Sequence, residues 1–182
     1  MKPLQAVAMG YVVIALFARQ GGYDLLADPV GWALVLLGVR RLPDPVTRPT
    51  LLYVGAVALV VSAALWVPPV LDAVVAEDPS IAWAAGLPAL GFAALLFREL
   101  AGAARTAGDD TPATVLQGLV TLTVVVALLP VLVFGAGLEG LADLAGGSGQ
   151  LLNLAAVAVL FSYSGRPWAT DSTAAAPGGS GR

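Results

Sequence analysis

Apolar runs alternate with short polar connections along the whole chain. About 20 apolar residues carry a helix across a bilayer, so the third, fourth and fifth of six runs have full length and the others are short. The pattern predicts an all-α integral membrane bundle of six transmembrane helices, arranged as three hairpins. The expected spans are residues 4–18, 25–39, 50–67, 80–97, 114–134 and 149–163.

The last apolar run is followed by a segment of a different kind. From residue 165 to 182 the chain is small, polar and rich in Gly and Pro. Such a composition cannot bury enough apolar surface to order itself. We therefore expect one transmembrane domain, residues 1–164, and a disordered cytoplasmic tail, residues 165–182.

The amino-acid composition is typical of a membrane protein, and it excludes several kinds of functional site. Hydrophobic residues make up 58% of the 182 residues, against roughly 45–50% in a soluble domain. The chain contains no Cys and no His. Disulfides, thiol nucleophiles, zinc sites and imidazole relays are therefore excluded. With no acid–base set to be found, we expect no enzyme activity, no cofactor and no metal.

The distribution of charge predicts an orientation. If the N-terminus is cytoplasmic, eight of the nine basic residues fall inside and only Arg19 falls outside. This matches the positive-inside rule and predicts a protein of the bacterial inner membrane with both termini in the cytoplasm. Acidic residues gather on the expected outer side: Asp24, Asp28, Asp72, Glu77, Asp78, Glu139 and Asp143.

One segment has the glycine spacing of a nucleotide-binding motif but lacks the context that such a site needs. The segment GAGLEG, residues 135–140, matches G-x-G-x-x-G. The apolar run before it is too long for a strand and contains Pro130, and no acid follows at the required distance. We interpret the segment as a turn between two helices.

The first expected hairpin is too short for two full crossings. Only 37 residues separate Lys2 from Arg40, whereas two crossings need about 40 before any turn is added. Either the bilayer thins there, or the tip lies at or below the outer surface. In that region Arg19, Asp24 and Asp28 would form an ion-pair or functional cluster. Asp28 precedes a proline and suits a helix start. Asp24 is open to three interpretations: a solvated loop acid, an ion pair with Arg19, or a ligand or cation site.

The same hairpin carries small residues at helical spacing. A helix over residues 23–38 would place Asp24, Asp28, Gly31 and Gly38 on one face, with Gly21-Gly22 as the break before it. Gly31 and Gly38 are candidates for close helix packing. Two further polar residues lie within expected spans, Gln117 and Asn153, where hydrogen bonds between helices are the commoner role.

About 20 residues of this hairpin carry a family resemblance. The segment YDLLADPVGWALVLLGVRRL has the form D-x-x-x-D-P-x-G-W from Asp24 to Trp32, then an apolar run to Arg40-Arg41. It resembles small multi-pass integral membrane proteins of actinobacterial type, whose function is unknown. The resemblance implies a membrane protein and no particular activity.

Two classes of function stay open. The first is a non-enzymatic membrane component or complex subunit that acts through helix contacts, with a membrane protein or a second copy as partner. The alternative is binding or transport of a small solute or cation through an outward-facing acidic vestibule. In both, the lipid bilayer is a partner and nucleic acid is not.

Overall fold

A computed structural model describes residues 1–16, 19–20, 23–24, 28–43, 48–77, 79–137, 140 and 142–170, and the structural statements below concern these residues. The chain folds into helices, as predicted. They are α1 (Pro3–Ala15), α2 (Asp28–Arg40), α3 (Arg48–Leu65), α4 (Pro68–Glu77), α5 (Pro79–Thr106), α6 (Asp110–Pro130), the π-helix η1 (Val131–Gly135), α7 (Ala142–Tyr163) and the 3-10 helix η3 (Pro167–Ala169).

The first hairpin contains the strands β1 (Arg19–Gln20) and β2 (Tyr23–Asp24). They pair antiparallel, with Arg19 opposite Asp24. The expected helix over residues 23–38 is therefore wrong in its first part, since α2 begins at Asp28. Pro29 explains this start, because its fixed φ suits the first helical turn. The expected break at Gly21-Gly22 lies outside the described residues.

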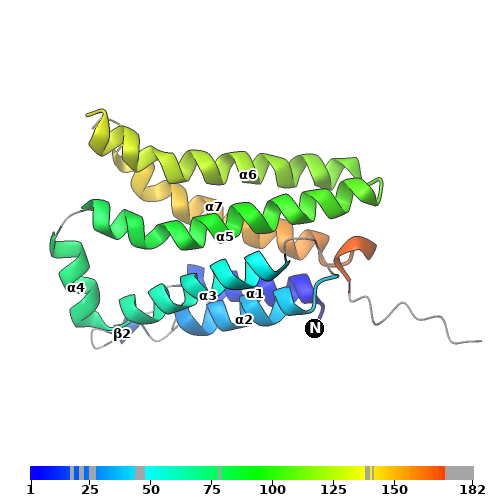
Figure 1. Cartoon of the computed structure of the whole chain (residues 1–182), viewed down its shortest axis with the longest axis horizontal. Coiled ribbons are helices and arrows are strands. Elements are labelled where there is room, and N and C mark those ends of the chain that lie inside the picture. Colours follow the sequence, from blue (N-terminus) through cyan, green and yellow to red (C-terminus); the bar gives the residue numbers. More distant parts are fainter. Residues whose placement is uncertain are drawn as a thin grey trace, which may run out of the picture.

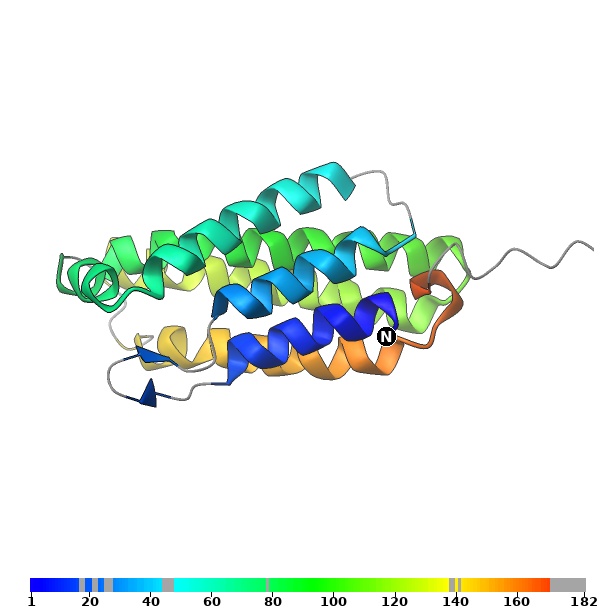
Figure 2. The ribbon, with the colours of Figure 1, turned by 90° about the horizontal axis from the view of Figure 1, so that it is seen from below.

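The long helices form a closed bundle (Figures 1 and 2). Contacts join α1 to α2, α2 to α3, α3 to α5, α5 to α6 and α6 to α7, and α7 returns to α1. The short α4 lies across one end and contacts α3 and α5. This closed order gives every long helix two neighbours and one shared interior.

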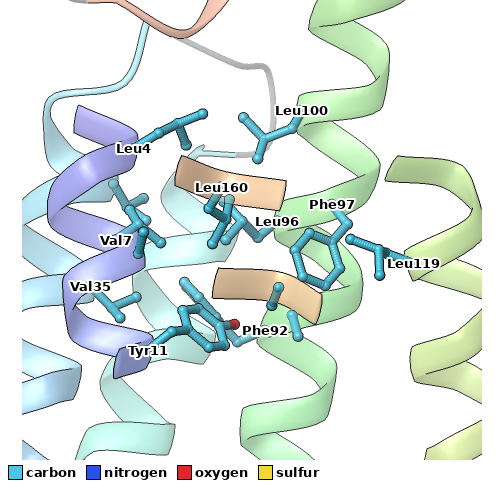
Figure 3. Packing of buried hydrophobic residues seen from close by; sticks show 14 of the residues in the cluster. Leu4, Val7, Tyr11, Val35, Phe92, Leu96, Phe97, Leu100, Leu119 and Leu160 are labelled. Carbon is cyan, nitrogen blue, oxygen red and sulfur yellow. The ribbon is translucent and has the colours of Figure 1, made fainter. Parts of the chain in front are cut away.

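Large apolar side chains fill that interior (Figure 3). Phe92 and Leu96 of α5 are fully buried, as are Val7 of α1 and Val35 of α2. Phe92 meets the indole of Trp32 edge-on, with ring centroids 5.3 Å apart. Burial of these rings ties α5 to the α1–α2 hairpin.

The two ends of the bundle differ in character. The first turn of α1, the last turns of α2, α5 and α7, and the first turns of α3 and α6 lie together at one end (Figures 1 and 2). We call it the basic end, because Lys2, Arg40, Arg41, Arg105 and Arg166 belong to it. The opposite end, which holds β1, β2 and α4, is the strand end. The helices therefore run up and down between two chemically distinct faces.

Length sets a limit on how many helices could cross a membrane. Among the described residues, α5 and α6 are long and apolar enough. A third crossing results if α3 and α4, which meet at 99°, count as one broken span. The described part of the chain therefore holds two or three helices of spanning length and not six. The reasons lie in particular elements: α1 and α2 have 13 residues each, about 20 Å of helix, and α3 ends at Leu65, shortly before Pro68-Pro69 starts α4 in another direction.

The disordered tail was expected from residue 165, but the structure has residues 165–170 in contact with the bundle. Trp168 donates a hydrogen bond from Nε1 to Oδ2 of Asp109, at 3.0 Å. The same carboxylate oxygen lies 3.2 Å from Nη1 of Arg166. These contacts hold η3 against the turn between α5 and α6, so residues 165–170 are part of the fold. Residues 171–182 lie outside the described residues.

Candidate functional site

Glycines bring the backbones of α1 and α2 into close contact. A Cβ atom added to Gly10 would lie 2.5 Å from the carbonyl oxygen of Gly31, and one added to Gly31 would lie 2.8 Å from that of Gly10. A Cβ on Gly38 would lie 2.8 Å from the carbonyl oxygen of Pro3. No side chain fits at such distances, so the two backbones touch.

Gly31 and Gly38, singled out from the sequence, thus both lie at one helix crossing inside the chain. Gly10 was missed, although it is the single glycine between residues 4 and 18. The crossing matters for the site because it fixes the start of α2. Asp28 and Trp32 lie on the first turns of that helix.

A chamber of about 450 Å³ opens at the strand end, between α1, α2, α3, α4 and α5. We call it the large chamber. Its wall carries one carboxylate, Asp28, one hydroxyl, Ser62, and two indoles, Trp32 and Trp66. The remaining wall is apolar: Ile14, Ala58, Val61, Leu65, Pro68, Leu71, Ala85, Gly86 and Ala89.

The polar groups of this chamber sit in an otherwise apolar setting. Asp28 is half-buried, and Trp32 is only 4% exposed. Within the described part of the chain, the buried Oγ of Ser62 makes no hydrogen bond. A volume of several hundred Å³ with few polar groups on a mostly apolar wall is the common form of a small-molecule site.

Arg19 and Asp24, the other two residues of the expected cluster, are paired through their backbones. Arg19 and Asp24 face each other across β1 and β2 at the strand end. Their side chains lie outside the described residues, so their relation to Asp28 stays a prediction. Asp24 and Asp28 do not share a helix face, because β2 and α2 are separate elements. Asp28 is the member of the cluster whose side chain is described, and it lies in the chamber wall.

A second, smaller cavity of about 140 Å³ lies deeper, between α1, α2, α5 and α7. We call it the small cavity. Asn153 and Tyr11 line it, and in the described structure neither Asn153 Oδ1 nor Tyr11 Oη has a hydrogen-bond partner. Tyr11 was missed from the sequence, because a tyrosine in an apolar helix usually serves the core.

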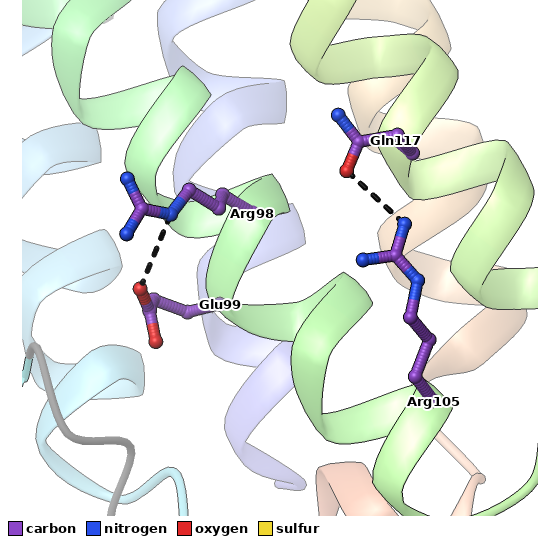
Figure 4. Close-up of polar contacts among 4 residues, drawn as sticks. All are labelled: Arg98, Glu99, Arg105 and Gln117. Carbon is purple, nitrogen blue, oxygen red and sulfur yellow. Dashed lines mark hydrogen bonds and ion pairs between the residues drawn. The ribbon is translucent and has the colours of Figure 1, made fainter.

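Gln117, the other polar residue within an expected span, has a different environment. Its Oε1 accepts a hydrogen bond from Nη2 of Arg105 at 3.2 Å, which links α5 to α6 on the exposed surface (Figure 4). Nearby on α5, Nε of Arg98 lies 4.0 Å from Oε1 of Glu99. These contacts lie away from both cavities, so Gln117 serves packing between helices.

Comparison with known proteins adds no family. No family model matches the chain, and no curated protein or solved structure is similar to it. Nor do the described residues bring together three Asp or Glu side chains that could hold a metal ion.

Proposed function

We propose that this chain is a non-enzymatic protein of the bacterial inner membrane that binds a small organic cation in the large chamber. One observation carries the proposal: Asp28 lies in the wall of a chamber of about 450 Å³ whose other walls are apolar and aromatic. The competing function, a scaffold that acts through its glycine face, is less well supported. That face is already occupied, because Gly31 and Gly38 pack against α1 of the same chain.

The exposed surface supports the membrane setting. The outward side of α6 carries a run of exposed apolar side chains, which water would not stabilise. They are Val115, Leu122, Val124, Val125 and Leu128. We place α5 and α6 across the bilayer, with α1, α2 and α7 beside them. The basic end then faces the cytoplasm and the strand end faces outward.

The short first hairpin is compatible with a strand end that faces outward. Since α1 and α2 each span about 20 Å, the strand end lies below the outer surface of a ~30 Å hydrocarbon core or the bilayer thins there. Polar groups are tolerated at that depth when they line a cavity inside the protein. The large chamber is such a cavity, and it would be reached from the outside.

The chemistry of the wall selects the ligand class. A carboxylate at membrane depth attracts a cation more strongly than it would in water. Trp32 and Trp66 line the same chamber, and Trp is the side chain best suited to cation–π attraction. The apolar remainder favours hydrocarbon over a hydrated metal ion. An ammonium group with an apolar body satisfies all three features.

Thermal unfolding of the purified protein tests this proposal. Choline and tetraalkylammonium ions should raise the melting temperature, whereas 3,3-dimethyl-1-butanol, which has choline's shape without its charge, should not. An equal shift with the neutral compound would show that charge is not recognised. If none of the ammonium ions shifts the melting temperature, the proposal is wrong.

A further inference from the structure

The small cavity holds two polar atoms that lack a partner. Among the described residues, Tyr11 Oη and Asn153 Oδ1 are both buried without a hydrogen bond, and both residues line this cavity. Tyr11 is only 7% exposed. Figure 3 shows its ring reaching from α1 toward α5 with the hydroxyl turned into the bundle. Because burial of an unpaired polar group is unfavourable, the pair points to an occupant that forms hydrogen bonds here.

The two atoms constrain that occupant. An amide oxygen only accepts hydrogen bonds, whereas a tyrosine hydroxyl both donates and accepts. The occupant must therefore donate a hydrogen bond to Asn153 and can complete the exchange with Tyr11. A hydroxyl group does both. An ammonium group fits less well, because none of the described residues of this wall carries a carboxylate to pair with it.

The rest of the wall argues for an organic group. Ile14, Leu90, Phe97 and Leu152 are apolar, and the volume of about 140 Å³ is close to that of protein cavities that hold a benzene ring. Water needs two to four polar partners in a buried site, and the described wall offers two such atoms, Tyr11 Oη and Asn153 Oδ1, among apolar side chains. A hydroxyl carried on a short hydrocarbon chain matches the wall better than a cluster of water molecules.

The small cavity also adjoins the large chamber. Ile14, Trp32 and Ala89 line both. Asp28 lies one helical turn before Trp32 on α2, toward the strand end. From the strand end inward, the groups follow one another in space: first the carboxylate of Asp28, then the indole of Trp32, which lines both spaces, and then the hydrogen-bonding pair of the small cavity.

We propose that the small cavity is the deep compartment of the large chamber, and that the ligand is an organic cation with a hydroxyl group at its far end. Asp28 holds the cation, the shared residues line the hydrocarbon chain, and Tyr11 and Asn153 bind the hydroxyl. This inference rests on the proposed function, since it takes the chamber to be a cation site.

Pairs of matched ligands test the hydroxyl site of the small cavity separately from the cation site of the large chamber. The probes are trimethylammonium ions with hydroxyalkyl chains of increasing length, each matched with an ion whose hydroxyl is replaced by methyl. The wild-type protein should bind the hydroxyl form about ten-fold more tightly once the chain is long enough, the effect of one buried hydrogen bond. Tyr11→Phe and Asn153→Leu should abolish that preference and still bind both ions. Gln117→Leu, a polar-to-apolar change on the exposed surface, should keep it.

A measurement without ligand gives an independent readout. Asn153→Leu should raise the melting temperature of the empty protein, because it removes an acceptor that has no partner. A structural hydrogen bond at Asn153 would give the opposite sign, and a lower melting temperature would overturn the inference. Equal binding of hydroxyl and methyl forms at every chain length would also overturn it and leave the cation site standing. If neither form binds, the proposed function fails first and the inference fails with it.

Discussion

The carbonyl oxygen of Gly31 occupies the place where a side chain on Gly10 would begin. A Cβ on Gly10 would lie 2.5 Å from that oxygen and 2.6 Å from Cγ2 of Val35. Backbone contact of this kind joins the two helices without any intervening side chain. It positions the first turn of α2, and with it Asp28 and Trp32, against the large chamber.

The crossing predicts a sharp response to small substitutions. Gly10→Ala and Gly31→Ala should each destabilise the fold by about 1–3 kcal/mol, since the added methyl has no space and the backbones must separate. Gly102→Ala on α5 is the matched control, because in the described structure no atom lies within 4 Å of its added Cβ. That change should be neutral or stabilising by up to about 1 kcal/mol. Melting temperatures of the three variants in detergent test the contrast, and equal losses at all three positions would contradict it.

Much of the α1–α2 hairpin could be predicted from local pattern. Helical spacing singled out Gly31 and Gly38, and Asp28-Pro29 indicated a helix start, because both signals act within one helix. Gly10 could not be paired with Gly31 in the same way. Which two helices touch is decided by tertiary packing, and a lone glycine in an apolar helix has several explanations.

The large chamber could not be predicted either, because tertiary packing decides which helices form its wall. Its wall draws on five helices, and Pro68 and Leu71 of α4 belong to it after the chain bends by 99° between α3 and α4. Pro68-Pro69 indicates a break but not its direction. The order of residues 165–170 likewise depends on a long-range bond, from Trp168 to Asp109, that composition does not encode.

That bond carries a second prediction, on the C-terminal segment. Asp109→Asn keeps one oxygen for Trp168 but removes the charge that faces Arg166, whereas Asp109→Ala removes both contacts. Asp109→Ala should cost about 1 kcal/mol of stability and speed cleavage near η3 by added protease, with the asparagine variant intermediate. Asp110→Ala, at the next position, is the control. Limited proteolysis at the basic end checks this, and identical cleavage of all variants would show that η3 is held by packing alone.

Orientation in the membrane gives a third prediction. Reporter fusions after Gly108, in the turn between α5 and α6, should report the cytoplasm, and fusions after Gly137 should report the exterior. Since Arg105 and Arg166 lie at the same end as Lys2, the positive-inside rule fixes the direction. The reverse pattern of reporter activity would place the large chamber on the cytoplasmic side.

Calorimetric titration measures whether Asp28 recognises the charge of a ligand in the large chamber. Purified wild-type protein is titrated with choline, and Asp28→Asn is compared with Asp72→Asn, which removes an exposed carboxylate on α4 outside the chamber. We expect Asp28→Asn to weaken binding about ten-fold or more, the loss of at least 1.4 kcal/mol, while Asp72→Asn binds as the wild type does. Equal affinity of all three proteins for choline, or no heat of binding in any of them, would contradict a cation site in the large chamber.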